Sequence, residues 1–146
     1  AKGSSSSSRR GFAANARAPL FLAQAAAPHL AARRGAIVNL VDIYADRPLR
    51  GHAVYCMAKA ALAMATRALA LELAPHVRVN GVAPGAVLWP EGGKDEAGRQ
   101  QVIERTPLAR TGTPEDVAAA VLWLLRDAPY TTGEILRVDG GRSLAM

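Results

Sequence analysis

Tyr55 and Lys59 are the two residues whose types and spacing most directly suggest proton transfer. They stand four positions apart in an alanine-rich stretch that favours helix, so both side chains project from one helix face. At ~4 Å and an effective dielectric constant of ~20, an ammonium group favours a phenolate by about 4 kcal/mol and so lowers the pKa of the phenol. Such a phenol can donate a proton near neutral pH. The pair could instead be an exposed aromatic residue beside a lysine.

Two other sequence features are expected at the same edge of a sheet. Asp42 follows the short, apolar, β-branched run 36–41, and Pro84-Gly85 follows a similar run, 77–82. Such runs are typical of strands covered on both faces, and ligands bind beyond the carboxyl ends of parallel strands. A carboxylate there could also cap a loop. Together with the tyrosine and the lysine, however, these residues predict one crevice.

The elements that hold this crevice follow from the pattern of alanine, proline and glycine. Helices are expected where alanine and leucine dominate, and strands where short β-branched runs occur. Their alternation predicts right-handed crossovers and a parallel α/β sheet with helices on both faces. The predicted helices are 13–32, 53–74, 96–104 and 114–125, and the predicted strands are 36–41, 77–82 and 134–138.

This predicted sheet lacks a neighbour on one side. A parallel strand that is apolar on both faces is not expected to finish a sheet as a bare edge. The sequence also has no glycine-rich turn between a first strand and a first helix, where a dinucleotide pyrophosphate would bind. We therefore expect the N-terminal dinucleotide-binding half to be missing. Residues 1–12 are expected to be a flexible tail or truncation scar, and residues 13–146 a C-terminal catalytic portion.

Composition narrows the class of protein and partner. Half of the 146 residues are apolar, which suits one core and one domain. The net charge of +6 is spread along the chain without a basic stripe, so nucleic-acid binding is not expected. No uninterrupted apolar run approaches the roughly eighteen residues that span a bilayer, so no membrane partner is expected. With a single cysteine, Cys56, the cytoplasm is the expected location.

Taken in order and spacing, these segments resemble the short-chain dehydrogenase/reductase family over about residues 13–144. Most of its members carry serine at the position of Asp42, whereas pteridine reductases resemble this chain there and in a stretch similar to 46–51. The resemblance implies a partial Rossmann-like fold. It rests on 37–42, on Tyr55-Cys56-Met57-Ala58-Lys59-Ala60-Ala61-Leu62, and on 71–74, 77–85, 110–116 and 132–141.

The same resemblance implies NADPH-dependent reduction of a pterin or dihydrofolate-type substrate. It implies Tyr55 as proton donor, Lys59 as the group that lowers its pKa and binds the cofactor ribose, and Asp42 as a second acid. Asn15 would support the lysine through water, although it could be an ordinary polar helix residue. An ionised Asp42 would raise the pKa of Tyr55. We therefore hypothesise that the two titrate as a coupled pair, with Asp42 partly protonated when substrate is bound.

The resemblance also implies a cofactor-binding loop and an assembly. Both long helices, 13–32 and 53–74, would pair between subunits to form a homotetramer. Trp89 would close over the substrate or, alternatively, anchor the core. Along with Tyr55 and Lys59, the implied cofactor-binding residues are Pro84, Gly85, Val87 and Leu88.

Other candidate residues and functions remain open. His29, His52 and His76 have no metal-ligand spacing and are expected at the surface or in packing. Cys56 is expected on a different helix face from Tyr55, as a small packing residue. Without the phosphate-binding turn, this chain could instead be an interaction module that cannot bind cofactor. A general carbonyl or acyl-carrier reductase is a third alternative, which the aspartate at position 42 disfavours.

Overall fold

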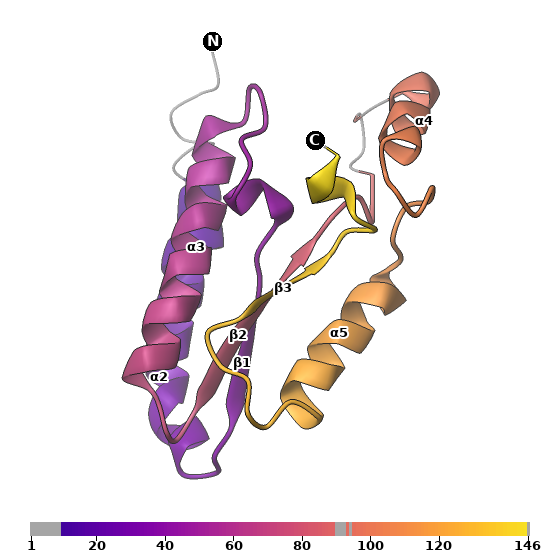
Figure 1. The fold of residues 1–146 in the computed structure, drawn as a ribbon. Helices are drawn as coiled ribbons and strands as arrows, with labels where there is room; N and C mark the ends of the chain where they lie inside the picture. Colours follow the sequence, from indigo (N-terminus) through magenta and orange to yellow (C-terminus); the bar gives the residue numbers. More distant parts are fainter. Residues whose placement is uncertain (1–9, 90–92, 94, 146) are drawn as a thin grey trace.

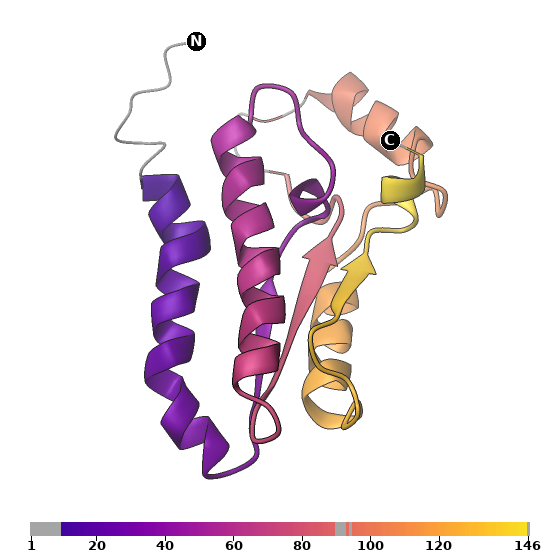
Figure 2. The ribbon, with the colours of Figure 1, turned by 60° about the vertical axis from the view of Figure 1, so that its left-hand side comes forward.

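A parallel sheet with helices on both faces organises the chain. In the computed structural model, which describes residues 10–89, 93 and 95–145, three strands form one sheet in the order β1-β2-β3. Helices α2 and α3 lie side by side on one face of the sheet, and α5 covers the other (Figures 1 and 2). The predicted doubly wound α/β fold is confirmed. The strands are β1 (Ala36–Leu40), β2 (Arg78–Pro84) and β3 (Ile135–Val138), and the helices are α2 (Ala18–Ala31), α3 (Ala53–Glu72), α4 (Glu96–Glu104) and α5 (Pro114–Arg126).

The first helical region begins earlier and is less regular than expected. Residues 10–12, which we expected in a tail, are already helical, and a π-helical turn, η1 (Ala13–Arg17), leads directly into α2. Pro28 lies inside α2 near its end. Single π-helical turns are uncommon and often occur at functional sites. The rest of the predicted tail, residues 1–9, lies outside the described residues.

Strand β2 extends two residues further than its β-branched run predicted. Pro84 pairs with Val138 of β3 as the last residue of the strand. On its other side, β1 has already ended at Leu40, so the N–H that proline lacks would have no strand partner there. A proline that reads as a turn signal is therefore compatible with a strand end.

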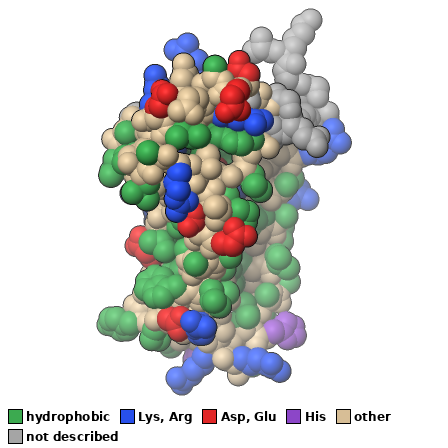
Figure 3. Space-filling model, turned by 90° about the vertical axis from the view of Figure 1, so that its right-hand side faces the viewer, with side chains coloured by type: hydrophobic (Ala, Val, Ile, Leu, Met, Phe, Trp, Pro, Cys, Tyr) green, Lys and Arg blue, Asp and Glu red, His purple; other side chains and the backbone are tan. Residues whose placement is uncertain are grey.

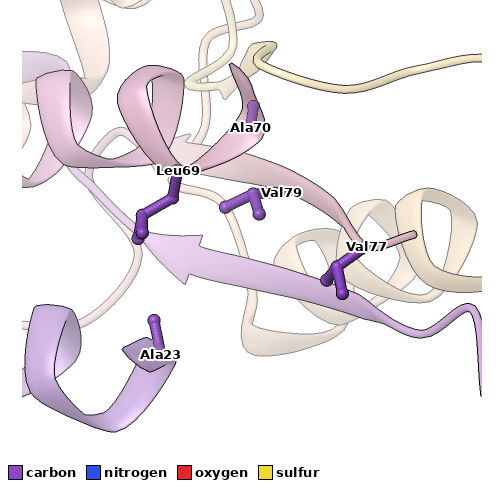
Figure 4. Packing of buried hydrophobic residues seen from close by; sticks show 5 residues of the cluster. All are labelled: Ala23, Leu69, Ala70, Val77 and Val79. Atoms are coloured by element: carbon purple, nitrogen blue, oxygen red, sulfur yellow. The ribbon is translucent and has the colours of Figure 1, made fainter. Parts of the chain in front are cut away.

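The core is divided between the two faces of the sheet. On the side of α2 and α3, five buried side chains form one cluster (Figure 4). On the side of α5, Val82, Leu124 and Ala128 form another. Both clusters hold the helices against β2, the central strand, and so fix the position of the strand ends. The cluster in Figure 4 consists of Ala23, Leu69, Ala70, Val77 and Val79.

Helix α5 is fixed at both ends by hydrogen bonds. At its start, Thr113 and Asp116 form a reciprocal capping box, as the sequence Thr-Pro-Glu-Asp suggested. At its end, the Arg78 guanidinium donates to the carbonyls of Leu124, Leu125 and Ala128 at 2.7, 2.9 and 3.0 Å. Leu122 and Trp123 of α5 are exposed apolar residues. Hydrophobic side chains are spread over the face of the molecule seen in Figure 3.

Helix α3 is apolar as well as long. Within the described residues it is the one helix whose 20-residue length and mean hydropathy of 1.3 would allow it to cross a membrane. Such a test is also passed by core helices, and α3 buries Ala58, Leu62 and Leu69 against the sheet side of the fold. This packing accounts for one side of the helix, whereas other apolar side chains of α3, such as Met64 and Leu71, stay exposed.

Candidate functional site

Three predicted catalytic residues meet beyond the carboxyl end of β1. Asp42 follows β1 by two residues and begins a 3-10 turn, η2 (Ile43–Ala45). Tyr55 and Lys59 lie in the first two turns of α3, whose start faces the same end of the sheet (Figure 1). All three are partly buried. The predicted convergence of a carboxylate, a phenol and an ammonium group is therefore present in the structure.

The Asp42 carboxylate makes two different hydrogen bonds. One oxygen, Oδ1, accepts from the backbone N–H of Tyr44 at 2.9 Å and so caps the 3-10 turn. The other, Oδ2, accepts from the Tyr55 hydroxyl at 2.6 Å. The first bond fixes the orientation of the carboxylate, and the second uses that orientation to direct the phenol. Both the loop-capping role and the acid-pair role proposed for Asp42 from the sequence are thus consistent with its contacts.

Lys59 is held at the edge of the sheet. Its Nζ donates to the backbone carbonyl of Leu40, the last residue of β1, at 2.8 Å. The same nitrogen lies 5.9 Å from the centroid of the Tyr55 ring. Sequence reasoning did not predict the Leu40 carbonyl as a partner, because a backbone acceptor leaves no signal in residue type. In this arrangement the ammonium group is positioned by the strand and not by the phenol.

The pKa of Tyr55 shifts in the opposite direction to the one expected from Lys59. Burial raises the pKa of Tyr55 above its ordinary value, and the hydrogen bond to Asp42 and the charge of that carboxylate raise it further. Burial lowers the pKa of Lys59, which the Asp42 charge opposes. The pKa of Tyr55 is therefore raised overall, because the hydroxyl donates to a carboxylate and a phenolate there would be repelled. The lowering contribution of Lys59 stays a prediction. The separate expectation that ionised Asp42 raises the pKa of Tyr55 agrees with this direction.

Asn15 lies in the middle of the π-helical turn η1. Its Nδ2 donates to the carbonyl of Gly11 at 2.9 Å, one turn earlier in the chain. Asn15 and Lys59 line the same groove between α2 and β1. Its predicted water-mediated support of Lys59 remains a prediction, since the bond seen here is local to the helix.

Pro84 ends the central strand, β2, and Gly85 follows it at the same edge of the sheet. Gly85 donates its N–H to Val138 at 3.0 Å, and a Cβ placed on it would lie only 2.8 Å from the Cα of Asp139. Glycine is required there because the two chain segments come so close. Val87 and Leu88 continue into the next loop, where 75% of the Leu88 surface is exposed. Their predicted contacts with a cofactor stay predictions.

Trp89 and Cys56 have partners that the sequence did not suggest. The guanidinium of Arg99, on α4, lies 5.7 Å from the centroid of the partly buried Trp89 ring. This cation–π contact joins the loop after β2 to α4.

The Cys56 Sγ accepts a hydrogen bond from the backbone N–H of Leu49 at 3.3 Å. Cys56 therefore holds the loop before α3 in place, in addition to the packing role expected from the sequence.

The histidines give no sign of a metal centre in the described part of the chain. There, no group of three or more histidine, cysteine, aspartate or glutamate side chains is placed to hold a metal ion. His52 Nδ1 lies 3.0 Å from the carbonyl of Arg50 in an exposed loop. The chemistry of the site therefore has to be argued from the phenol, the carboxylate and the ammonium group.

Solved structures with a similar fold support this description. The chain is similar to a SCOR enzyme from Clostridium thermocellum, with a TM-score of 0.87, 28% identity, and coverage of 99% of this chain and 57% of that one. It is also similar to acetoin dehydrogenase from Salmonella typhimurium, with a TM-score of 0.83, 35% identity, and coverage of 97% and 57%.

Sequence comparisons identify the family. L-xylulose reductase of Caenorhabditis elegans is 43% identical over 141 residues, which are 92% of this chain and 56% of that protein. D-erythrulose reductase of Gallus gallus is 41% identical over 143 residues, with coverage of 90% and 56%. The chain thus spans little more than half the length of these curated relatives. Residues 2–143 match the family described as enoyl-(acyl carrier protein) reductase, and the chain belongs to the short-chain dehydrogenase/reductase family of oxidoreductases.

Proposed function

We propose that this chain carries the proton-donating centre of an NADPH-dependent reductase that acts on a pterin or dihydrofolate-type substrate. The observation that carries the proposal is the 2.6 Å hydrogen bond from the Tyr55 hydroxyl to Asp42, next to Lys59 at the strand end. Family membership supports a nicotinamide-dependent oxidoreductase. The choice of NADPH as cofactor and of a pterin as substrate goes beyond family membership. It rests on Asp42 and on the resemblance described above.

The argument for a pterin starts from the charge of Asp42. A simple ketone presents only oxygen lone pairs, which an ionised carboxylate beside the proton donor would repel. A pterin ring presents N–H and amino groups, which can donate to that carboxylate, together with a ring nitrogen that can accept a proton. A carboxylate in this position therefore favours a nitrogen-rich heterocycle and disfavours a plain carbonyl compound.

In the proposed reaction, this chain supplies a proton and the geometry for its transfer. The nicotinamide cofactor, when bound, supplies the hydride to a carbon of the substrate. Tyr55 gives its hydroxyl proton to the neighbouring substrate nitrogen, and solvent or a protonated Asp42 replaces it. Because an ionised Asp42 holds the phenol proton, transfer becomes easier when Asp42 gains a proton or bonds to the substrate instead. Lys59 stabilises the phenolate that remains.

The chain's own residues fit one end of the cofactor. The Tyr55 hydroxyl and the Lys59 ammonium are donors of the kind that bind ribose hydroxyl groups. In the stretches that the structure describes there is no glycine-rich turn between a strand and a helix to bind the pyrophosphate. We therefore assign the nicotinamide-ribose end of the cofactor to the described residues.

A second candidate substrate is a small hydroxyketone. The relatives named above include proteins called L-xylulose reductase, D-erythrulose reductase and acetoin dehydrogenase, and none of these is called a pteridine reductase. A protonated Asp42 could donate to a ketone oxygen, so this candidate does not conflict with the geometry. Its hydroxyl groups can also donate to an ionised Asp42, as the N–H groups of a pterin can, so the two candidates have to be separated by their measured turnover.

Assembly into a tetramer through α2 and α3 is also proposed. Phe21 and Leu22 on α2, and Met57, Met64 and Leu71 on α3, are apolar side chains with more than half of their surface exposed. Apolar helix faces of this kind are typical of subunit interfaces. The same surface would serve the alternative function, an interaction module without catalytic activity.

One experiment separates these functions. The purified chain is titrated with NADPH, with binding followed by fluorescence, in the presence and absence of dihydrobiopterin, and NADPH oxidation is then measured with dihydrobiopterin or L-xylulose. The proposal expects saturable binding and oxidation that depends on dihydrobiopterin. Oxidation with L-xylulose alone would favour the hydroxyketone candidate, and no binding would favour the interaction module. Asp42→Ser should lower kcat/KM for dihydrobiopterin at least about tenfold relative to that for L-xylulose.

A further inference from the structure

The 3-10 turn η2 carries a carboxylate at each end. It is the short purple helix between the start of α3 and the carboxyl ends of the strands in Figure 1. Asp42 precedes the turn and accepts from the Tyr55 hydroxyl of α3 at 2.6 Å. Asp46 ends the turn and forms an ion pair with Arg137 of β3, with 2.9 Å between Oδ2 and Nη2. The turn therefore connects the proton donor on α3 to a cation on β3.

The middle of this turn is anchored in the core. Ile43 is only 2% exposed and belongs to a buried cluster against which Ile135 of β3 also packs. Ile135 and Arg137 lie two residues apart, so they share one face of the strand. Inside the turn, the Asp46 N–H donates to the Ile43 carbonyl at 3.3 Å, and the Asp42 carboxylate caps the other end. Because the core holds the middle of the turn, the contacts at its two ends decide its orientation.

Arg137 acts on two carboxylates at once. Burial opposes ionisation of Asp139, but hydrogen bonds from Ser143 and Gly141, together with the nearby charge of Arg137, hold the pKa of Asp139 below its ordinary value. The backbone N–H groups of Ser143 and Gly141 donate to this carboxylate at 2.8 and 2.9 Å. Without the guanidinium, the ionised Asp139 would repel Asp46. Loss of Arg137 therefore removes an attraction between η2 and β3 and leaves a repulsion in its place.

We propose that Asp46 and Arg137 are positioning residues, which hold η2 against β3 so that the Asp42 carboxylate can accept from the Tyr55 hydroxyl. Both side chains of the ion pair are about half exposed. Exposed ion pairs contribute little to the free energy of unfolding, so the pair sets geometry more than stability. Its consequence for turnover rests on the proposed function, whereas its effect on the Tyr55 phenol does not.

The Tyr55 phenol reports the position of η2, and ultraviolet titration measures it. In each variant, the difference from the same variant with Tyr55→Phe isolates this phenol. The other titratable groups that act on its hydroxyl or lie near its ring are Asp42, Tyr44, Cys56 and Lys59, and they are the same in every variant. Loss of a nearby cation by itself favours the neutral phenol and raises its pKa, whereas a weaker bond to Asp42 lowers it. The direction of the change therefore separates positioning from a direct effect of charge.

Arg137→Met should lower the pKa of Tyr55, with an ionisation constant at least about threefold higher than in the parent. Arg137→Lys keeps the charge and should titrate as the parent does. Arg126→Met is the matched control, because Arg126 forms a similar exposed pair with Asp127 at 2.8 Å, at the end of α5 that lies by the strand starts. It too should titrate as the parent does. No change or a rise in Arg137→Met, or an equal fall in Arg126→Met, would overturn the proposal.

Two further variants keep the test decisive. Arg137→Gln gives the same measurement if Arg137→Met does not fold. Asp46→Ala removes the other half of the pair, and its combination with Arg137→Met should lower the Tyr55 pKa no further than Arg137→Met alone, because both remove one contact. Effects that add would overturn the proposal.

Turnover separates this proposal from the proposed function. With dihydrobiopterin, Arg137→Met should lower kcat/KM at least about threefold, because Asp42 is displaced from the substrate, and should leave the KM for NADPH unchanged. A lowered Tyr55 pKa without any reduction by the parent would overturn the proposed function and support the positioning role. Reduction by the parent that Arg137→Met leaves intact, with an unchanged Tyr55 pKa, would overturn the positioning role alone.

Discussion

Two polar clusters on neighbouring strands of the sheet show how a structural network differs from a reactive one. At the start of β2, the side chains of Arg78 and buried Asn80 bond to backbone groups at the end of α5 and in the segment between α5 and β3. At the end of β1, Asp42 and Tyr55 bond to each other, and each can gain or lose a proton. In the first cluster, every bond joins a side chain to a fixed backbone group. The second has a bond whose strength depends on pH, which is what proton transfer requires.

The largest effect that separates the two clusters is expected from Tyr55→Phe. Loss of the hydroxyl removes the proton donor, so the proposed reduction should fall by about 10²–10⁴-fold in kcat. The free energy of unfolding, measured with urea, should change by less than about 1.5 kcal/mol, since one partly buried hydrogen bond is lost. Tyr130→Phe, at a fully exposed tyrosine, is the control. Near-normal turnover by Tyr55→Phe would remove Tyr55 from the mechanism.

Asn80→Ala, in the cluster at the start of β2, should give the reverse pattern: a large loss of stability and a small effect on turnover. The side chain is fully buried, donates to the Thr131 carbonyl at 2.9 Å and accepts from the Glu134 N–H at 3.0 Å. Its loss leaves two backbone groups without these partners, which should cost about 2–4 kcal/mol in the free energy of unfolding. Urea denaturation measures the cost. A cost below 1 kcal/mol would mean that water replaces the amide, and that this cluster is less rigid than described.

A smaller loss is expected from Arg78→Met. The substitution keeps most of the apolar stem but removes three donors from the carbonyls at the end of α5. A loss of about 1–3 kcal/mol is expected, because Arg78 is only partly buried and water can replace its guanidinium more easily than the fully buried amide of Asn80. Comparing the two variants by thermal unfolding tests this order. Equal losses would contradict the assignment of Arg78 as a helix-end cap.

The smallest effect is a dependence of stability on alkaline pH. Because the pKa of Tyr55 is raised in the folded chain, the unfolded chain loses this proton first, at a pH near 10. The contribution of Tyr55 is therefore fully present below about pH 10 and is lost as the pH rises further. Urea denaturation between pH 9 and 11 should show a steeper decline for the parent than for Tyr55→Phe. Parallel curves would contradict the raised pKa.

Most of the fold could be predicted from the sequence because its signals are local. A helical piece was predicted near residues 96–104, where α4 lies, and Thr113 and Pro114 indicated the start of α5. The strand end at Pro84 was missed because it depends on where the neighbouring strand stops. The π-helical turn around Asn15 was missed as well, since no residue pattern distinguishes it from the α-helix that follows.

The sequence predicted which residues form the candidate site, but not the direction in which the pKa of Tyr55 shifts. Asp42 stands at the end of a strand and Tyr55 and Lys59 share a helix face, so their meeting follows from the topology. The direction of the pKa shift of Tyr55 depends on which neighbour accepts the hydrogen bond from its hydroxyl, and side-chain geometry decides this. The sequence suggested Lys59 as the dominant neighbour, whereas the structure has the hydroxyl bonded to Asp42 and Lys59 bonded to Leu40.

An ultraviolet titration of the Tyr55 phenol tests the pairing with Asp42 most directly, and it needs neither cofactor nor substrate. The difference between the parent and Tyr55→Phe isolates this phenol from Tyr44 and Tyr130. We expect Tyr55 to ionise above the ordinary value of about 10, and Asp42→Asn to lower its pKa while leaving the fold intact. A Tyr55 that ionises at or below about 10 in the parent, or with the same pKa in Asp42→Asn, would contradict the account.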